Sequence, residues 1–190
     1  IITATNVFAH IDNINETVNM IDDLLMGDGI FISESHYLLT LIEENQYDTI
    51  YHEHLRYYSL SSLNYLFNKH GLEIIDAKKI NTHGGSIRVY AAKKNKHKIN
   101  NKFEDLILTE NKYLFKDGIY DFKNKVIESK INFYNLLSKI NLKNKQIYGI
   151  SAPSRATTLI NYLGVTSNIL RCIVEISGSQ KINHYLPGTD

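Results

Sequence analysis

IITATNVFAHIDNINETVNMIDDLLMGDGIFISE, residues 1–34, contains three consecutive patterns that decide the fold. Residues 1–8 are apolar and rich in β-branched side chains, which predicts a buried strand. In residues 11–29 the apolar side chains recur at helical spacing, with asparagines that can cap the helix and glycines that can end it. Residues 29–34 predict a second strand. Strand, helix, glycine turn and strand form a βαβ unit, the repeating piece of a parallel α/β sheet.

The middle of the sequence predicts one helix and a pair of strands. The helix opens at Ser59 or Ser61 and closes at Gly71. LEIIDAKKI, residues 72–80, predicts a strand, and THGGSIRVYAAKK, residues 82–94, predicts another after a Gly-Gly turn. The two strands are close enough in the sequence to pair antiparallel.

KKNKHKINNK, residues 93–102, is polar and basic and predicts a hinge between two domains. We therefore expect residues 1–94 to form one domain and residues 95–190 a second, smaller α/β domain. Within the second domain, residues 103–140 keep an apolar stripe at helical spacing and predict two helices broken near Asp117-Gly118.

A second βαβ unit follows these helices. QIYGI (146–150) predicts a strand, APSRATTLINYLG (152–164) a helix with Pro153 in its first turn, and ILRCIVEI (169–176) another strand. Cys172 falls in this last apolar strand, where we expect it to be part of the core.

Composition excludes several classes of function. The 21 basic and 20 acidic residues leave a formal charge of +1, which argues against binding to nucleic acid or a membrane through bulk charge. One cysteine excludes an internal disulfide and a cysteine-built zinc site within this chain. With a single cysteine, a reducing cytoplasm is the expected location. No apolar run is long enough for a transmembrane helix. Because the sequence begins without Met and ends abruptly, we expect a piece of a longer protein.

YHEHLRYYSL, residues 51–60, concentrates titratable and hydroxyl groups in ten positions. Histidine accepts a proton near neutral pH, a neighbouring carboxylate stabilises the resulting imidazolium, and a tyrosine hydroxyl donates to a developing oxyanion. Tyr51, Glu53 and His54 therefore suit the removal of a proton next to a carbonyl. Two other readings stay open: a metal site built from His52, Glu53 and His54, and a polar strand edge without chemistry.

Three further segments carry candidate ligand-binding residues. His10, in NVFAHID, falls just beyond the carboxyl end of a predicted strand, where open α/β sheets bind ligands, although a surface loop histidine is as common. In HGGSIR (83–88), Gly-Gly lets the backbone approach a ligand, but a plain hairpin turn is the more frequent explanation. In GISAPSRATT (149–158), a helix begins after a strand and Arg155 adds positive charge, but the spacing of a dinucleotide-binding glycine motif is absent.

Together and in this order, these segments resemble the S-adenosylmethionine-dependent sugar C-methyltransferases, which act on nucleotide-linked keto-deoxysugars. The resemblance rests on NVFAHID, YDTIYHEHLRYYSL, GLEIID with THGGSIRVYA, IYGISAPSRATTLINY and YLPGTD, and it covers nearly the whole chain. It implies the second half of a Rossmann-like methyltransferase domain followed by a smaller Rossmann-like α/β domain. It also implies that a zinc-binding domain and the main adenosylmethionine loop precede Ile1, so that zinc is expected only there.

By this resemblance, His54 is the general base, Tyr51 and Glu53 line the same pocket, and His10 lies across from them. The base removes a proton from the carbon next to the ketone, and the resulting enolate takes the methyl group. Asn6 is expected at the methyl donor. The residues expected to contact the nucleotide-linked sugar are Tyr57, Tyr58, His83, Ser86, Arg88 and Arg155.

The chain departs from the family at the start of the second βαβ unit. Ser151 and Ala156 stand where the family has glycines, Arg155 stands for a lysine, and Glu175 stands for an aspartate. Whatever this part of the family binds is therefore expected to be bound differently here. Two alternatives to sugar C-methylation remain: a methyltransferase for a nitrogen or oxygen acceptor, and a binding or assembly module without catalysis. The oligomeric state is left open.

Overall fold

The computed structural model describes residues 1–143 and 145–189, which form two compact units. The first unit contains Ile1–Asn45 and Glu53–Phe122, and the second contains Gln46–His52 and the chain from Lys123 onward. The predicted division into functional domains at residues 94 and 95 stays a prediction.

The N-terminal βαβ unit is confirmed. Strand β1 (Ile2–Thr5) pairs in parallel with β2 (Phe31–His36), and helix α1 (Ile14–Leu24) connects them. The Asn13 side chain caps α1 by accepting a hydrogen bond from the Glu16 backbone N–H. The cap and the helix are therefore local features that the sequence pattern predicts.

Strand β1 is shorter than predicted. It ends at Thr5 because Asn6 adopts a left-handed backbone conformation with φ of 53°, which strands do not tolerate. Phe8–His10 then form a short 3₁₀ turn. This turn still contributes an apolar side chain to the core, because Phe8 is fully buried.

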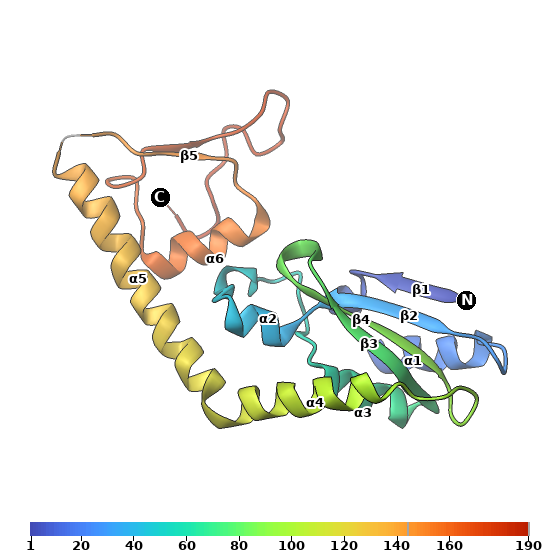
Figure 1. The fold of residues 1–190 in the computed structure, drawn as a ribbon. Coiled ribbons are helices and arrows are strands. Elements are labelled where there is room, and N and C mark those ends of the chain that lie inside the picture. Colours follow the sequence, from blue (N-terminus) through green and yellow to red (C-terminus); the bar gives the residue numbers. More distant parts are fainter. Residues whose placement is uncertain (144, 190) are drawn as a thin grey trace. The chain divides into compact units, whose positions relative to one another are not determined.

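The predicted antiparallel pair is also confirmed, as β3 (Leu72–Ile80) and β4 (Ser86–Lys93). The sheet order is β1-β2-β4-β3, with β4 antiparallel to both of its neighbours (Figure 1). This mixed sheet with helices confirms the expected α/β class.

The helices of the first unit are α1, α2 (Leu38–Glu43), α3 (Leu60–Lys69) and α4 (Asn101–Tyr113). Ser59 caps α3 as predicted, in a reciprocal arrangement in which the Ser62 hydroxyl accepts from the Ser59 backbone N–H. Helices α3 and α4 both contact β3.

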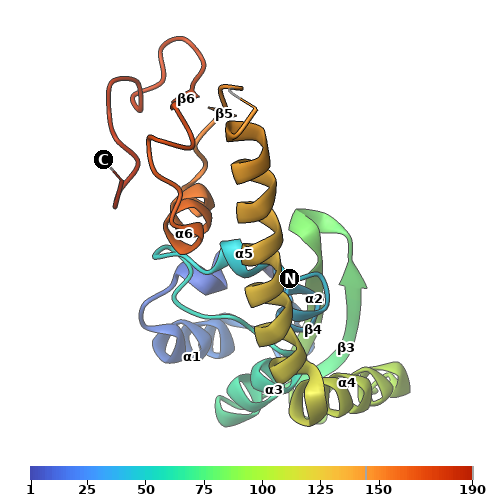
Figure 2. The same cartoon turned by 90° about the vertical axis from the view of Figure 1, so that its left-hand side faces the viewer.

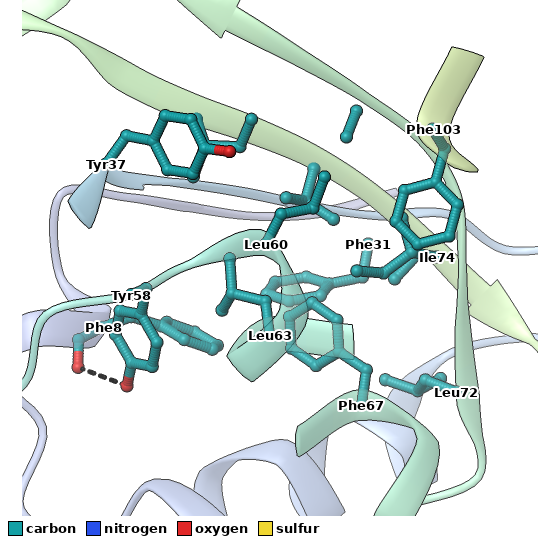
Figure 3. Packing of buried hydrophobic residues seen from close by; sticks show 14 of the residues in the cluster. Phe8, Phe31, Tyr37, Tyr58, Leu60, Leu63, Phe67, Leu72, Ile74 and Phe103 are labelled. Atoms are coloured by element: carbon teal, nitrogen blue, oxygen red, sulfur yellow. Dashed lines mark hydrogen bonds between the residues drawn. The ribbon is translucent and has the colours of Figure 1, made fainter. Parts of the chain in front are cut away.

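A continuous aromatic and aliphatic core joins these helices to the sheet (Figure 3). The rings of Phe8, Phe31 and Phe67 lie within 6.2 Å of one another, measured between centroids. Edge-to-face contacts of this kind add to the stability gained by removing each ring from water. Phe103 brings α4 into the same cluster.

Glu110 on α4 is fully buried and binds the start of α3. Its Oε2 accepts from the Leu60 backbone N–H at 2.5 Å, and its Oε1 accepts from the Ser61 N–H at 2.9 Å and the Ser61 hydroxyl at 2.6 Å. The first N–H groups of a helix have no partner within the helix and carry partial positive charge. The carboxylate is therefore stabilised by the helix end. Burial, with the nearby charge of Glu110, raises the pKa of the Tyr37 phenol well above its ordinary value.

The predicted break between two helices is confirmed. Helix α4 leads into a π-helical turn, Leu114–Gly118, and α5 follows from Ile119 to Asn141. A side chain at Gly118 would place its Cβ 2.6 Å from the Tyr113 carbonyl oxygen, so the widened turn requires glycine. α4 packs in the core of the first unit, beyond the basic segment at which we expected a domain boundary.

The second βαβ unit is confirmed within the second compact unit. Strands β5 (Tyr148–Ile150) and β6 (Cys172–Val174) pair in parallel, and α6 (Ser154–Leu163) connects them. Leu163 packs with Leu137 of α5, and α6 lies beside α5 (Figure 2). Pro153 is the N-cap of α6, one position before the predicted first turn.

The prediction that Cys172 is a core residue is wrong, because its side chain is exposed. In the two-stranded sheet, residues alternate between faces, and Cys172 pairs with the exposed Tyr148. The inward positions of the pair are Gly149 and Ile173. An apolar strand pattern predicts a strand but does not say which of its faces is covered.

Within the part of the chain that the structure describes, no helix combines the length and apolar character needed to cross a membrane.

We predict that Glu110→Gln lowers the free energy of unfolding by about 2–3 kcal/mol, because an amide keeps one acceptor but turns a donor toward the backbone N–H groups of α3. Urea denaturation of the full-length protein measures the change. Glu104→Gln, an exposed acidic position on the same helix, is the control and should change stability by less than about 0.5 kcal/mol. Equal effects of the two substitutions would contradict a special role for Glu110.

Candidate active site

Residues 8–12, which follow β1, are bound to residues 55–58, the continuation of the histidine-rich stretch. The Leu55 backbone N–H donates to the Ala9 carbonyl at 2.9 Å. The Tyr58 hydroxyl donates to the Phe8 carbonyl at 3.3 Å, a bond drawn in Figure 3. These contacts place His10 and His54, which are far apart in the sequence, on neighbouring segments.

The imidazole rings of His10 and His54 are in contact. Their centroids are 5.1 Å apart with the ring planes 64° from parallel, and the Tyr57 ring lies 5.9 Å from that of His54. His10 is exposed, whereas His54 and Tyr57 are half-buried. A half-buried imidazole beside an exposed one is an arrangement in which a proton taken from a bound molecule can pass on to solvent.

The other residues of the predicted catalytic group are divided between the units. Glu53 is exposed and belongs, with His54, to the first unit. Tyr51 and His52 belong to the second unit, where their ring centroids are 6.1 Å apart. Among the residues that the structure describes, no three histidine, cysteine, aspartate or glutamate side chains are grouped to hold a metal ion.

Tyr58 was expected to contact substrate, but the structure places it in the core. It is 5% exposed, and its hydroxyl already has the Phe8 carbonyl as a partner. Burial raises the pKa of Tyr58 to about 12, which keeps the phenol protonated at neutral pH. Tyr58 therefore packs in the core beside the 3₁₀ turn, and its contact with substrate stays a prediction.

The HGGSIR segment forms a tight turn attached to a buried carboxylate. Arg88 donates two hydrogen bonds to Oε2 of Glu34, at 2.9 and 3.0 Å, and Thr82 donates to Oε1 at 3.0 Å. The bonds to Glu34 raise the pKa of the Arg88 guanidinium. Glu34 lies opposite Arg88 on the adjacent strand, so the strand register creates this pair.

Within this turn, His83 and Ser86 differ in accessibility. His83 is exposed and has a left-handed backbone with φ of 50°. Ser86 is fully buried, and its hydroxyl donates to the Thr82 carbonyl at 3.1 Å, so it serves the turn. Gly85 allows the turn to approach α2, because a Cβ there would lie 2.3 Å from the Thr40 side chain.

The turn between β5 and α6 is organised by Glu175. Its Oε1 accepts from the Ala152 backbone N–H at 2.6 Å, and Lys181 donates to the Ala152 carbonyl at 2.7 Å. The hydrogen bond from Ala152, supported by the charge of Lys181, lowers the pKa of the Glu175 carboxyl. A cavity of about 660 Å³ opens at this turn, with Glu175 and Lys181 in its wall.

Arg155, the expected charged contact on α6, is paired with an aspartate of the same unit. Its Nε lies 3.4 Å from Oδ2 of Asp48, and its side chain remains half exposed. Ser151, which replaces a family glycine, has φ of 63°. The backbone at this position is therefore of the kind that glycine adopts most readily.

Sequence reasoning assigned no role to Arg56, Glu34 or Glu110, and it noted Glu175 only as a departure from the family pattern. Three of them are acidic residues in apolar or helical contexts, which a sequence shows only as isolated charges. Arg56 lies inside the histidine-rich stretch. Its position as a charged residue between predicted site residues is the signal by which the sequence could have identified it.

Comparison with known proteins identifies the family. Residues 81–190 match the family model described as the C-methyltransferase C-terminal domain, and residues 1–77 match that of a methyltransferase domain. The chain therefore belongs to the C-methyltransferase family, which confirms the resemblance seen in its motifs.

One relative is the C-methyltransferase NovU of Streptomyces niveus. It is 51% identical over 85 residues, which are 45% of this chain and 20% of that protein. The matched part therefore spans a fifth of the length of the curated relative.

We predict that Ser151→Gly preserves or raises the free energy of unfolding, by up to about 1 kcal/mol, because it relieves a left-handed conformation at a residue with a Cβ. The same change at Ser154, in the first turn of α6, should instead lower it by about 0.5–1 kcal/mol. Urea denaturation of the two variants measures the difference. Destabilisation of similar size at both positions would show that the serine side chain matters more than the backbone.

Proposed function

We propose that this protein takes part in S-adenosylmethionine-dependent C-methylation of a nucleotide-linked keto-deoxysugar. The observation that carries the proposal is the contact between His10 and His54, with Tyr57 beside them, in a chain of the C-methyltransferase family. A carbon acceptor must lose a proton before it can be methylated, and two adjacent imidazoles suit that task. A nitrogen acceptor has less need of such a base.

In the proposed reaction, His54 is the general base. A hydrogen on the carbon next to the ketone is weakly acidic, and an imidazole nitrogen of His54 accepts it as the C–H electrons move toward the ketone oxygen. Glu53, the residue before His54 in the same unit, adds negative charge that favours the imidazolium. The nucleophilic carbon would then form its new C–C bond to the methyl group of the donor as the bond between that methyl group and sulfur breaks. The electron pair of the broken bond would stay on the sulfur, which becomes neutral, and the proton remains on His54.

The proton on His54 has to leave before the next turnover. His10 contacts the His54 ring and is exposed, so it can receive this proton and release it to water.

Adenosylmethionine, when bound, supplies the electrophilic methyl group and carries it on a positively charged sulfur. Asn6 fits a role at this donor, because it follows the carboxyl end of a parallel strand and is half-buried. Its backbone N–H is committed to the Glu34 carbonyl at 2.8 Å, which leaves the side-chain amide as the group to contact a ligand.

The proposed contacts to the nucleotide-linked sugar are Tyr57, His83, Arg88 and Arg155. Arg88 donates its Nε–H and an Nη2–H to Glu34, so it would offer other guanidinium N–H groups of its five to a ligand. Arg155 would bind a phosphate in competition with Asp48. Pairing to a carboxylate also holds each guanidinium in a defined orientation.

The full-length protein should be incubated with methyl-labelled adenosylmethionine and a panel of nucleotide-linked keto-sugars. Mass spectrometry and NMR should find the label on a carbon next to the ketone. Label on nitrogen or oxygen, or none despite donor binding, would contradict the proposal.

We predict that His54→Asn slows methyl transfer by about 10²–10⁴-fold, because a positioned general base contributes this much to the rate. It should also abolish deuterium incorporation next to the ketone in D₂O without methyl donor, while leaving donor affinity unchanged. His97→Asn is the control, since His97 contacts the Asp28 carbonyl and has no proposed part in the reaction. Normal turnover by His54→Asn would remove His54 from the mechanism.

We predict that His10→Asn lowers kcat by about tenfold or more and changes KM less, because His10 acts on the proton rather than on substrate affinity. Steady-state kinetics with the best keto-sugar of the panel measure both constants. A rise in KM with unchanged kcat would instead make His10 a binding residue.

A further inference from the structure

Arg56 binds the backbone carbonyls of Ile11 and Asp12, the two residues that directly follow His10 in the chain. Its Nη2 donates to the Asp12 carbonyl at 2.7 Å, and its Nη1 donates to the Ile11 carbonyl. Arg56 is half-buried and lies two residues after His54. One side chain therefore connects the segment that carries His54 to the segment that carries His10.

The guanidinium group is suited to this connection. It is planar, always charged, and presents N–H groups in a fixed fork, so it can hold two acceptors at a defined separation. Hydrogen bonds from a charged donor are also stronger than those between neutral groups. A lysine at this position has a single ammonium group and cannot reproduce the fork.

The contacts of Arg56 complement those of its neighbours. Leu55 binds the Ala9 carbonyl on the other side of His10, so the backbone is held both before and after the histidine. His10 is exposed at the end of the 3₁₀ turn Phe8–His10, in which its backbone N–H donates to the Val7 carbonyl at 3.0 Å. The cross-segment bonds hold the backbone on both sides of His10 against the segment that carries His54.

We propose that Arg56 is a positioning residue that sets the separation of the His10 and His54 rings. It acts through the backbone of residues 11 and 12 and does not itself touch the reacting atoms. Its effect on catalysis rests on the function proposed above, but its effect on the ring contact does not. The two are therefore tested separately.

The ring contact is tested by NMR on the full-length protein with ¹³C-labelled histidine, without any substrate. Rings in contact give a nuclear Overhauser cross-peak between their protons, and His10→Asn and His54→Asn identify it. Arg56→Ala should lose this cross-peak, and Arg56→Lys should weaken it. Millimolar guanidinium should restore it in Arg56→Ala, whereas urea, a neutral planar analogue at the same concentration, should not.

A cross-peak that persists in Arg56→Ala would overturn the proposal. So would a loss that neither guanidinium nor lysine reverses, because the cause would then be disruption of the whole segment rather than two missing N–H donors. Far-UV circular dichroism identifies a variant that has failed to fold.

The catalytic consequence is tested with the best keto-sugar of the panel. Arg56→Ala should lower kcat about 10–100-fold with KM within twofold, because a misplaced catalytic group costs rate rather than affinity. Guanidinium should rescue kcat in Arg56→Ala but not in His54→Asn. If the cross-peak responds as expected and kcat does not, Arg56 is confirmed as a positioning residue and the proposed role of His10 fails.

Discussion

The buried carboxylate of Glu110 at the start of α3 is the contact on which the first unit depends. It accepts the backbone N–H groups of Leu60 and Ser61, which would otherwise be unpartnered at a helix end. Residues 53–58 lead directly into this helix, so Glu110 fixes one end of the segment that carries His54. A residue on α4 thus binds the start of a helix some fifty positions earlier in the sequence.

The first unit uses a second buried carboxylate in a similar way. Glu34 of β2 holds Arg88 on β4 and Thr82 in the preceding turn. Each of the two carboxylates accepts several hydrogen bonds, because a buried charge is costly without such partners. Each also contacts a segment with candidate site residues, Glu110 the one that leads into α3 and Glu34 the turn between β3 and β4.

Local patterns in the sequence predicted most of the elements. Periodicity and caps located α1, α3 and α6, and the Gly-Gly turn located the β3–β4 hairpin, because each of these depends on residues close in the chain. The order of strands was not predictable in the same way. β4 lies between β2 and β3, and its pairing with β2 joins residues some fifty positions apart, such as Glu34 and Arg88. The end of β1 was also missed, because the left-handed Asn6 interrupts an apolar run that otherwise looks continuous.

By itself, the sequence determined the α/β class, the C-methyltransferase family and the identity of the histidines worth testing. It could do so because residue type and local spacing carry those signals. Only the tertiary structure decided that His10 touches His54, that Tyr58 belongs to the core, and that Cys172 is exposed. It also showed that Arg56 joins the two histidine segments. These facts depend on contacts between residues far apart in the chain and on which faces of the strands and helices are covered. The local spacing of residue types determines neither.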